Sequence, residues 1–253
     1  MRTLDPNREL DEFQSRADDS YARYARLFRV VSGAHDVSAL RKGLAVDAAF
    51  RLGSEWETFQ HSWHVAAIAK DSTKLIATER RRIEEIVSKV PEASREVFNV
   101  TFTHQNLTRL KGSDIERLLD PQNRNITFAD TSAWREQTNK YLSRTYMAKV
   151  NRIYSSDADS CVLELLKSLR NAIAHGSLDA KARLNRAVRP RANQLGISGP
   201  ENDALLRDTY GIRDIGTYLH GWTGATGLRL QPEGTRVALI HTRVADIAKL
   251  LRV

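Results

Sequence analysis

Apolar residues recur at steps of three and four along most of this chain, and no other sequence feature constrains the fold as strongly. Only 13 glycines and 6 prolines interrupt the 253 residues. We therefore expect a mostly helical chain with a buried core. The first apolar stripe, in 8–31, consists of Leu10, Phe13, Ala17, Tyr21, Tyr24, Phe28 and Val31. The second, in 37–69, consists of Leu40, Leu44, Ala48, Leu52, Trp56, Phe59, Trp63 and Ala66.

Further helices are predicted across the rest of the chain, and the C-terminal part is less regular. Phe98–Thr103 alternates like a strand, but we assign it to a helix as well. Near the C-terminus, Val237–Ile240 is expected to form a short β element before a closing helix over 244–251. We thus predict one all-α domain over 1–253, apart from this β element, with a C-terminal elaboration at about 190–253. Its other helices are expected in 71–90, from Pro91 onward, and in 113–119, 134–153, 157–176, 180–188 and 204–210.

Composition narrows the classes of protein that this chain can belong to. No run reaches the roughly 18 apolar residues of a membrane span, and the first residues lack the apolar core of a signal peptide. The single cysteine, Cys161, excludes an intrachain disulfide and fits a reducing compartment. We therefore expect a cytoplasmic protein without a membrane partner.

The chain carries a net charge of +8, and 29 of its 39 basic residues are arginine. Arginine binds phosphate bidentately, so this excess favours a nucleic-acid partner. A GC-rich genome raises the arginine content as well, so composition alone leaves the question open.

The heptapeptide 170–176, at the end of the predicted helix 157–176, combines an arginine, an amide and a histidine. Turning 100° per residue gives this helix a core stripe. That stripe is Val162, Leu165, Leu166, Leu169, Ala172 and Ile173. The opposite side carries the polar motif residues Arg170, Asn171 and His175 together with Leu163, Glu164, Lys167 and Ala174. The motif therefore lies on a second face, although a histidine before Gly176 is also typical of an ordinary helix end.

The spacing within the motif favours a site shared by two copies of the chain. Five residues apart, Arg170 and His175 diverge by about 140° on a regular helix. Two copies facing each other across a two-fold axis would bring both pairs into one cleft. We therefore predict a homodimer with Leu163, Glu164 and Ala174 at the interface.

The segment Arg170-Asn171-Ala172-Ile173-Ala174-His175-Gly176 resembles the signature of the HEPN superfamily, an arginine and a polar residue followed after three residues by a histidine. This resemblance implies an all-α bundle that dimerises through the motif helices. Many such domains are metal-independent endoribonucleases of toxin–antitoxin or phage-defence systems. By this resemblance Arg170, Asn171 and His175 are the catalytic residues, and an antitoxin or defence partner is implied.

The chemistry expected of these residues is RNA cleavage without a metal or other cofactor. RNA carries its own nucleophile, the 2′-OH, so proton transfer by His175 and charge stabilisation by Arg170 suffice, with Asn171 orienting His175 or binding a phosphate oxygen. A basic run after the motif is expected to hold the RNA backbone, although such a run is equally typical of a solvated helix. The predicted RNA-binding residues are Lys167, Lys181, Arg183, Arg186, Arg189 and Arg191.

Other functions have weaker support in the sequence. The main alternative is a non-catalytic HEPN module that binds RNA or a nucleotide, or acts as a scaffold for a partner protein. A helical DNA-binding regulator lacks a clear helix-turn-helix pair. His61 and His64 have a spacing compatible with metal ligation but no evident third ligand, and Gly221–Gly227 lacks the flanking strand and helix of a phosphate loop.

Overall fold

The computed structural model describes residues 4–97, 109–120, 128, 130–188, 205, 212–221, 223, 228 and 231–253. Every regular element in these ranges is a helix, which confirms the all-α prediction. None of the helices in these ranges is both long and apolar enough to cross a membrane. The longer elements are α1 (Pro6–Val30), α2 (Val37–Lys70), α3 (Thr73–Ser88), α6 (Thr131–Tyr141), α7 (Arg144–Tyr154), α8 (Asp157–His175), α9 (Leu178–Ala187) and α12 (Arg236–Lys249). The shorter ones are α4 (Glu92–Val97), α5 (Gly112–Leu119), α11 (Ile215–His220) and the 3₁₀ turns η1 (Val31–Gly33) and η2 (Pro232–Gly234).

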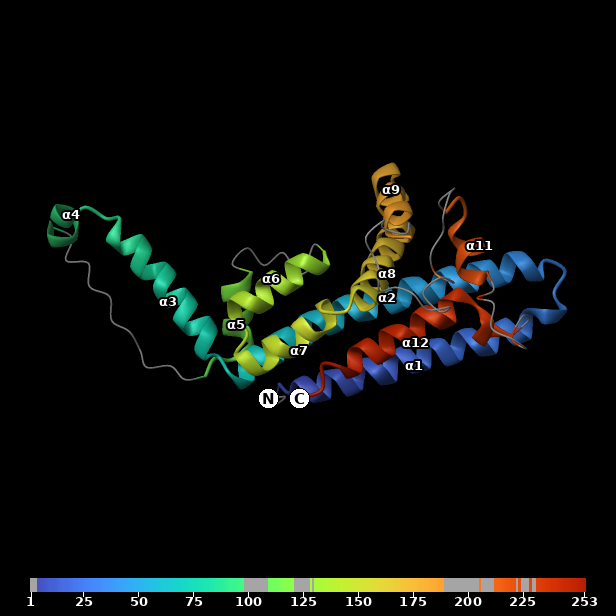
Figure 1. The fold of residues 1–253 in the computed structure, drawn as a ribbon, viewed down its shortest axis with the longest axis horizontal. Coiled ribbons are helices and arrows are strands. Elements are labelled where there is room, and N and C mark those ends of the chain that lie inside the picture. The colour runs from blue at the N-terminus through green and yellow to red at the C-terminus, as the bar shows by residue number, and fades with distance from the viewer. Residues whose placement is uncertain are drawn as a thin grey trace.

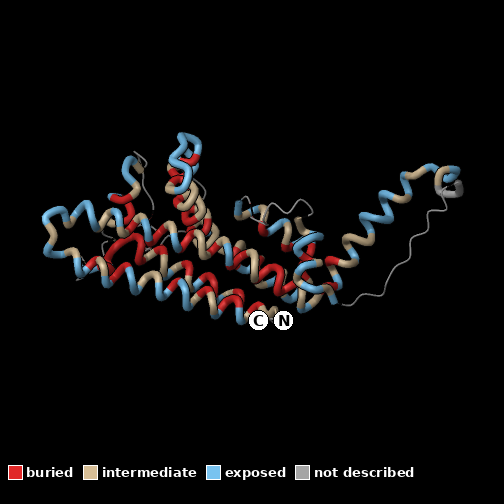
Figure 2. Tube along the Cα trace, turned by 180° about the vertical axis from the view of Figure 1, so that it is seen from behind, coloured by how far each residue is buried: buried red, intermediate tan, exposed pale blue. Residues whose placement is uncertain are grey.

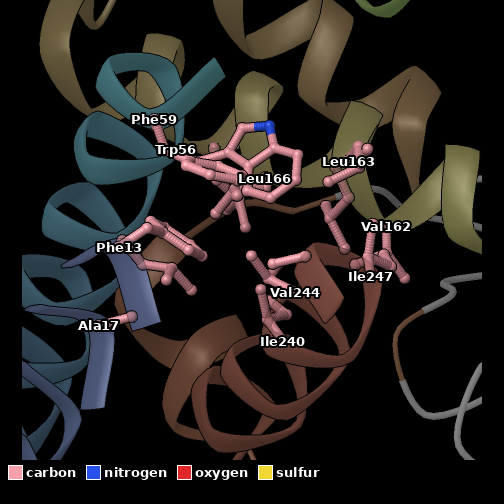
Figure 3. Close-up of a cluster of buried hydrophobic side chains, with 14 of the residues drawn as sticks. Phe13, Ala17, Trp56, Phe59, Val162, Leu163, Leu166, Ile240, Val244 and Ile247 are labelled. Atoms are coloured by element: carbon pink, nitrogen blue, oxygen red, sulfur yellow. The ribbon is translucent and has the colours of Figure 1, made fainter. Parts of the chain in front are cut away.

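The body of the molecule is built on the long helices α1 and α2, which lie side by side, with α12 along α1 (Figure 1). The predicted apolar stripes of α1 and α2 meet at stacked rings, with the centroids of Phe13 and Phe59 4.6 Å apart. Figure 3 shows side chains from α8 and α12, among them Leu166 and Val244, completing this core. The core thus joins helices from both ends of the sequence and includes the motif helix α8.

Helices α3 and α4 project away from this body (Figure 1). The first half of α3 packs on α6, where Thr78 donates to the carbonyl of Lys140 and the Tyr141 hydroxyl donates to Glu79. The second half of α3 is exposed along its length (Figure 2), including the apolar side chain of Ile86.

Two predictions about secondary structure are wrong. Val237–Ile240 belongs to α12 and not to a strand, because the Thr235 hydroxyl caps the helix and Val237, Ile240 and Val244 continue the helical spacing into the core. The predicted helix 134–153 is divided into α6 and α7 by extended backbone at Leu142. Phe98–Thr103 and, apart from Leu205, the segment 204–210 lie outside the described residues.

His64 is fully buried on α2, and its ring lies 5.3 Å from that of Phe128. Neither ring nitrogen has a hydrogen-bond partner among the described residues. Burial disfavours the charged imidazolium and lowers the pKa of His64 to about 3, with a smaller contribution from His61. His64 is therefore neutral in the folded protein and protonates near its ordinary pKa on unfolding.

This difference makes the stability of the fold depend on pH. Below pH 6.5 the unfolded chain binds a proton at His64 that the folded chain does not, so stability is full above this pH and falls as the pH falls. When the pH is lowered from 7.5 to 5.5, we expect the buried His64 to lower the unfolding free energy by about 1.4 kcal/mol. Urea denaturation should show this loss in the wild type and a loss smaller by that amount in His64→Leu. His35→Leu, at an exposed histidine, is the control; equal pH dependence of all three proteins would contradict this account.

Candidate functional site

The motif helix α8 has well-defined ends. The Ser156 hydroxyl caps its start by accepting from the amide of Asp159, at 3.2 Å. At its end Gly176 has a φ of 59°, a left-handed conformation that favours glycine, and its amide donates to the carbonyl of Ala172. Ser177 then caps α9. The observed helix, Asp157–His175, agrees with the prediction and fixes His175 as its last residue.

Helix α8 crosses α2 very closely at Gly53. A Cβ atom at Gly53 would lie 2.7 Å from the Cβ of Arg170, which is inside any normal contact distance. One turn further along α2, the Glu57 Oε2 atom lies 3.3 Å from Arg170 Nε. The second carboxylate oxygen of Glu57 lies 4.0 Å from the Lys167 ammonium. The crossing thus brings one carboxylate of α2 against two cations of α8.

Arg170 and Asn171 interact directly, whereas His175 stands apart. Arg170 Nη1 donates to Asn171 Oδ1 at 3.0 Å, so the amide oxygen holds the arginine. That Asn171 orients His175 or binds a phosphate oxygen stays a prediction. The Arg170 side chain is 27% exposed, and His175 is exposed at the helix end. The arrangement keeps a fixed guanidinium and an accessible imidazole on different sides of the same helix.

Two predicted site residues, Leu163 and Lys167, are largely buried and not exposed as predicted. Leu163 is only 1% exposed within a single chain, so its placement at a dimer interface is wrong. The error arises because α8 packs against both α2 and α12 and therefore buries more than one stripe (Figure 3). Lys167 is 16% exposed and donates to the carbonyl of Phe128, so its ammonium is engaged inside the protein and not presented to RNA. Burial, only partly opposed by Glu57, lowers its pKa.

Of the other predicted interface residues, Ala174 lies near the end of α8 and Glu164 in its first half. Ala174 is exposed, Glu164 is half-buried, and Leu178 at the start of α9 is 86% exposed. Among the predicted RNA-binding residues, the exposed ones on α9 are Lys181, Arg183 and Arg186, with Arg183 paired to Asp179 at 3.0 Å. Arg189 and Arg191 lie outside the described residues.

Sequence reasoning missed Glu57 and Gly53. Together with Gln60 they occupy one face of α2 at steps of three and four, and this polar, small-residue strip within an apolar helix was the available signal. A small hollow at the crossing is lined by Gly53 and Glu57 and also by Asp130 and Lys167. No group of three or more residues able to hold a metal is present in the described ranges, and His64 is buried while His61 faces Glu116.

Searches of protein-family models, of curated proteins and of solved structures found no match to this chain.

The close crossing predicts opposite effects of the same substitution at two glycines of α2. Gly53→Ala inserts a Cβ against Arg170 and should lower the unfolding free energy by roughly 1–3 kcal/mol, because the two helices must separate. Gly43→Ala, where nothing lies within 4 Å, should raise it by about 0.5–1 kcal/mol through reduced chain entropy. Urea denaturation at pH 7.5 measures both; a stabilised Gly53→Ala would show that the contact is not tight.

Proposed function

We propose that this protein is a metal-independent endoribonuclease of the HEPN type, with an active site formed between two copies of the chain. The observation that carries the proposal is that Arg170 and His175 have different surroundings. Glu57 and Asn171 hold Arg170 against α2, while His175 is exposed at the end of the same helix. A fixed cation and an accessible proton carrier are the two groups that RNA cleavage through the 2′-OH requires.

In the proposed reaction the 2′-oxygen of a ribose attacks the adjacent phosphorus and the bond from phosphorus to the 5′-oxygen breaks. A base removes the proton of the 2′-OH, and an acid supplies a proton to the leaving 5′-oxygen. The products are a 2′,3′-cyclic phosphate and a 5′-OH. One His175 serves as the base and the other as the acid when two copies meet, and Arg170 stabilises the charge of the phosphorane-like transition state.

A dimer formed through the end of α8 is part of this proposal. Ala174 and Leu178 provide small and apolar exposed surface beside His175, as a two-fold contact requires. Leu163 takes no part in this revised interface, because it is buried within its own chain.

One observation favours the alternative, a module that binds RNA without cleaving it. The ion pair with Glu57 partly neutralises Arg170, the cation on which charge stabilisation depends. A binding module keeps its affinity for RNA and yields no cyclic phosphate, so the same cleavage assay separates the two functions.

Cleavage should require both motif residues. We expect Arg170→Ala and His175→Ala each to reduce the rate of RNA cleavage by about 10²–10⁴, since each removes charge stabilisation or proton transfer. Arg81→Ala and His35→Ala remove an exposed arginine and histidine elsewhere and should leave the rate unchanged. The assay follows a labelled RNA in EDTA and identifies the cyclic phosphate by mass spectrometry. Cleavage that is abolished by EDTA, that acts equally on DNA, or that survives both motif substitutions would contradict the proposal.

Disrupting the α8–α9 corner should dissociate the dimer. Leu178→Glu places a charge in the proposed interface and should weaken dimerisation at least tenfold, with a matching loss of cleavage at low protein concentration. Ile86→Glu changes another exposed apolar residue, 56% exposed on α3, and is the control. Light scattering over a concentration series measures both. If Leu178→Glu showed the same dimer mass as the wild type over the whole concentration series, this interface would be excluded.

A further inference from the structure

A hydrogen bond places a distant segment beside the basic helix α9. Asn185 Oδ1 on α9 accepts from the backbone amide of Ile212, at 2.6 Å. The next residue, Arg213, is exposed and carries a positive charge. The cations of α9 therefore continue onto a residue that follows them by more than two dozen positions in the sequence.

The same segment leads on to the first turns of α2. Asp214 caps α11, and hydrogen bonds from Thr217 lower the pKa of its carboxyl, with a smaller contribution from the charge of Lys42. Lys42 is packed against α11, since its Cβ would lie 2.9 Å from a Cβ at Gly216. Arg41 precedes Lys42 but is engaged within the protein, because its guanidinium lies 4.1 Å from the centre of the Phe28 ring and donates to the Phe28 carbonyl and the Ser32 hydroxyl. The segment 212–216 thus places Arg213 between the basic helix α9 and Lys42 of α2.

The helices next to these cations lie on one side of the molecule, and Lys42 lies the length of a short RNA segment from the α8 crossing. Helices α9 and α11 rise from the same side of the α1–α2 layer (Figures 1 and 2). Gly53, where α8 crosses α2, and Lys42 are separated by roughly 17 Å along the helix axis. A stacked strand advances about 3.4 Å per nucleotide, so about five nucleotides cover this distance.

We infer that Lys181, Arg186, Arg213 and Lys42 form a path that binds the RNA backbone beyond the α8 site. The inference rests on the proposed function in taking RNA as the ligand. An RNA strand carries one phosphate charge per nucleotide. It fits this surface because the cations are spread along it and not gathered at one point. The acids beside the path are engaged locally, Asp179 by Arg183 and Asp214 as a helix cap.

The test compares RNA length and salt in a background that binds without cleaving. His175→Ala supplies this background, and fluorescein-labelled RNAs of 4 and 12 nucleotides are titrated at 50–300 mM salt. Lys42→Ala/Arg213→Ala should weaken binding of the 12-mer about tenfold and leave the 4-mer unchanged. Two lost phosphate contacts should also reduce the slope of log affinity against log salt by about 1.4. The matched control removes two exposed cations from the projecting helix region, Arg81→Ala/Lys89→Ala, and should alter neither quantity.

Each contrary outcome identifies what fails. Equal losses in both double variants, equal losses for the 4-mer and the 12-mer, or no RNA binding by the His175→Ala protein would overturn the path. Binding of an acidic peptide that is weakened as strongly as RNA binding would assign the surface to a protein partner and also overturn it. Length-dependent binding along the path without cleavage by the wild type would overturn the nuclease alone. If the wild type cleaves RNA but Lys42→Ala/Arg213→Ala leaves the affinity for the 12-mer unaltered, the path alone is overturned.

Discussion

The close crossing of α2 and α8 at Gly53 is the contact on which the candidate site depends. A side chain at this position would separate the helices and withdraw Glu57 from Arg170. The Nε of Arg170 is buried and has no hydrogen-bond partner among the described residues, so the nearby carboxylate is what offsets the burial of its charge. The same carboxylate faces the largely buried Lys167. One glycine thus permits an arrangement of three charged groups that a wider helix packing would expose to water.

The helical framework could be predicted because the sequence signals that specify each helix lie within or next to that helix. Apolar steps of three and four, together with caps such as Ser156 and Ser177, set the extent of α1, α2, α8 and α9 within a few residues. The strand predicted at Val237–Ile240 failed because a short apolar run has the same appearance in a strand and in a buried helix. What decides between them is burial on several sides by α1, α2 and α8, and that information is not local.

The candidate site was predictable only in part for the same reason. A helical projection of α8 placed Arg170, Asn171 and His175 outside the core stripe, and all three are at least partly accessible. The projection assumed one buried stripe, yet α8 is covered by several helices, so Leu163 and Lys167 are largely enclosed. Glu57 belongs to a helix more than a hundred residues earlier, and no pattern within the motif helix could reveal it.

The different contacts of Arg170 and His175 suit their proposed tasks. Charge stabilisation is most effective when the stabilising group is fixed before the reaction, and Glu57, Asn171 and the α2 backbone fix Arg170. Proton transfer requires only that the imidazole reach its oxygen once substrate is bound, and His175 at a helix end keeps that freedom. The cost of fixing Arg170 is a weaker local positive field, because Glu57 offsets part of it. In the proposed function, the path of cations inferred outside the site, from α9 through Arg213 to Lys42, offsets this loss by attracting RNA without loosening Arg170.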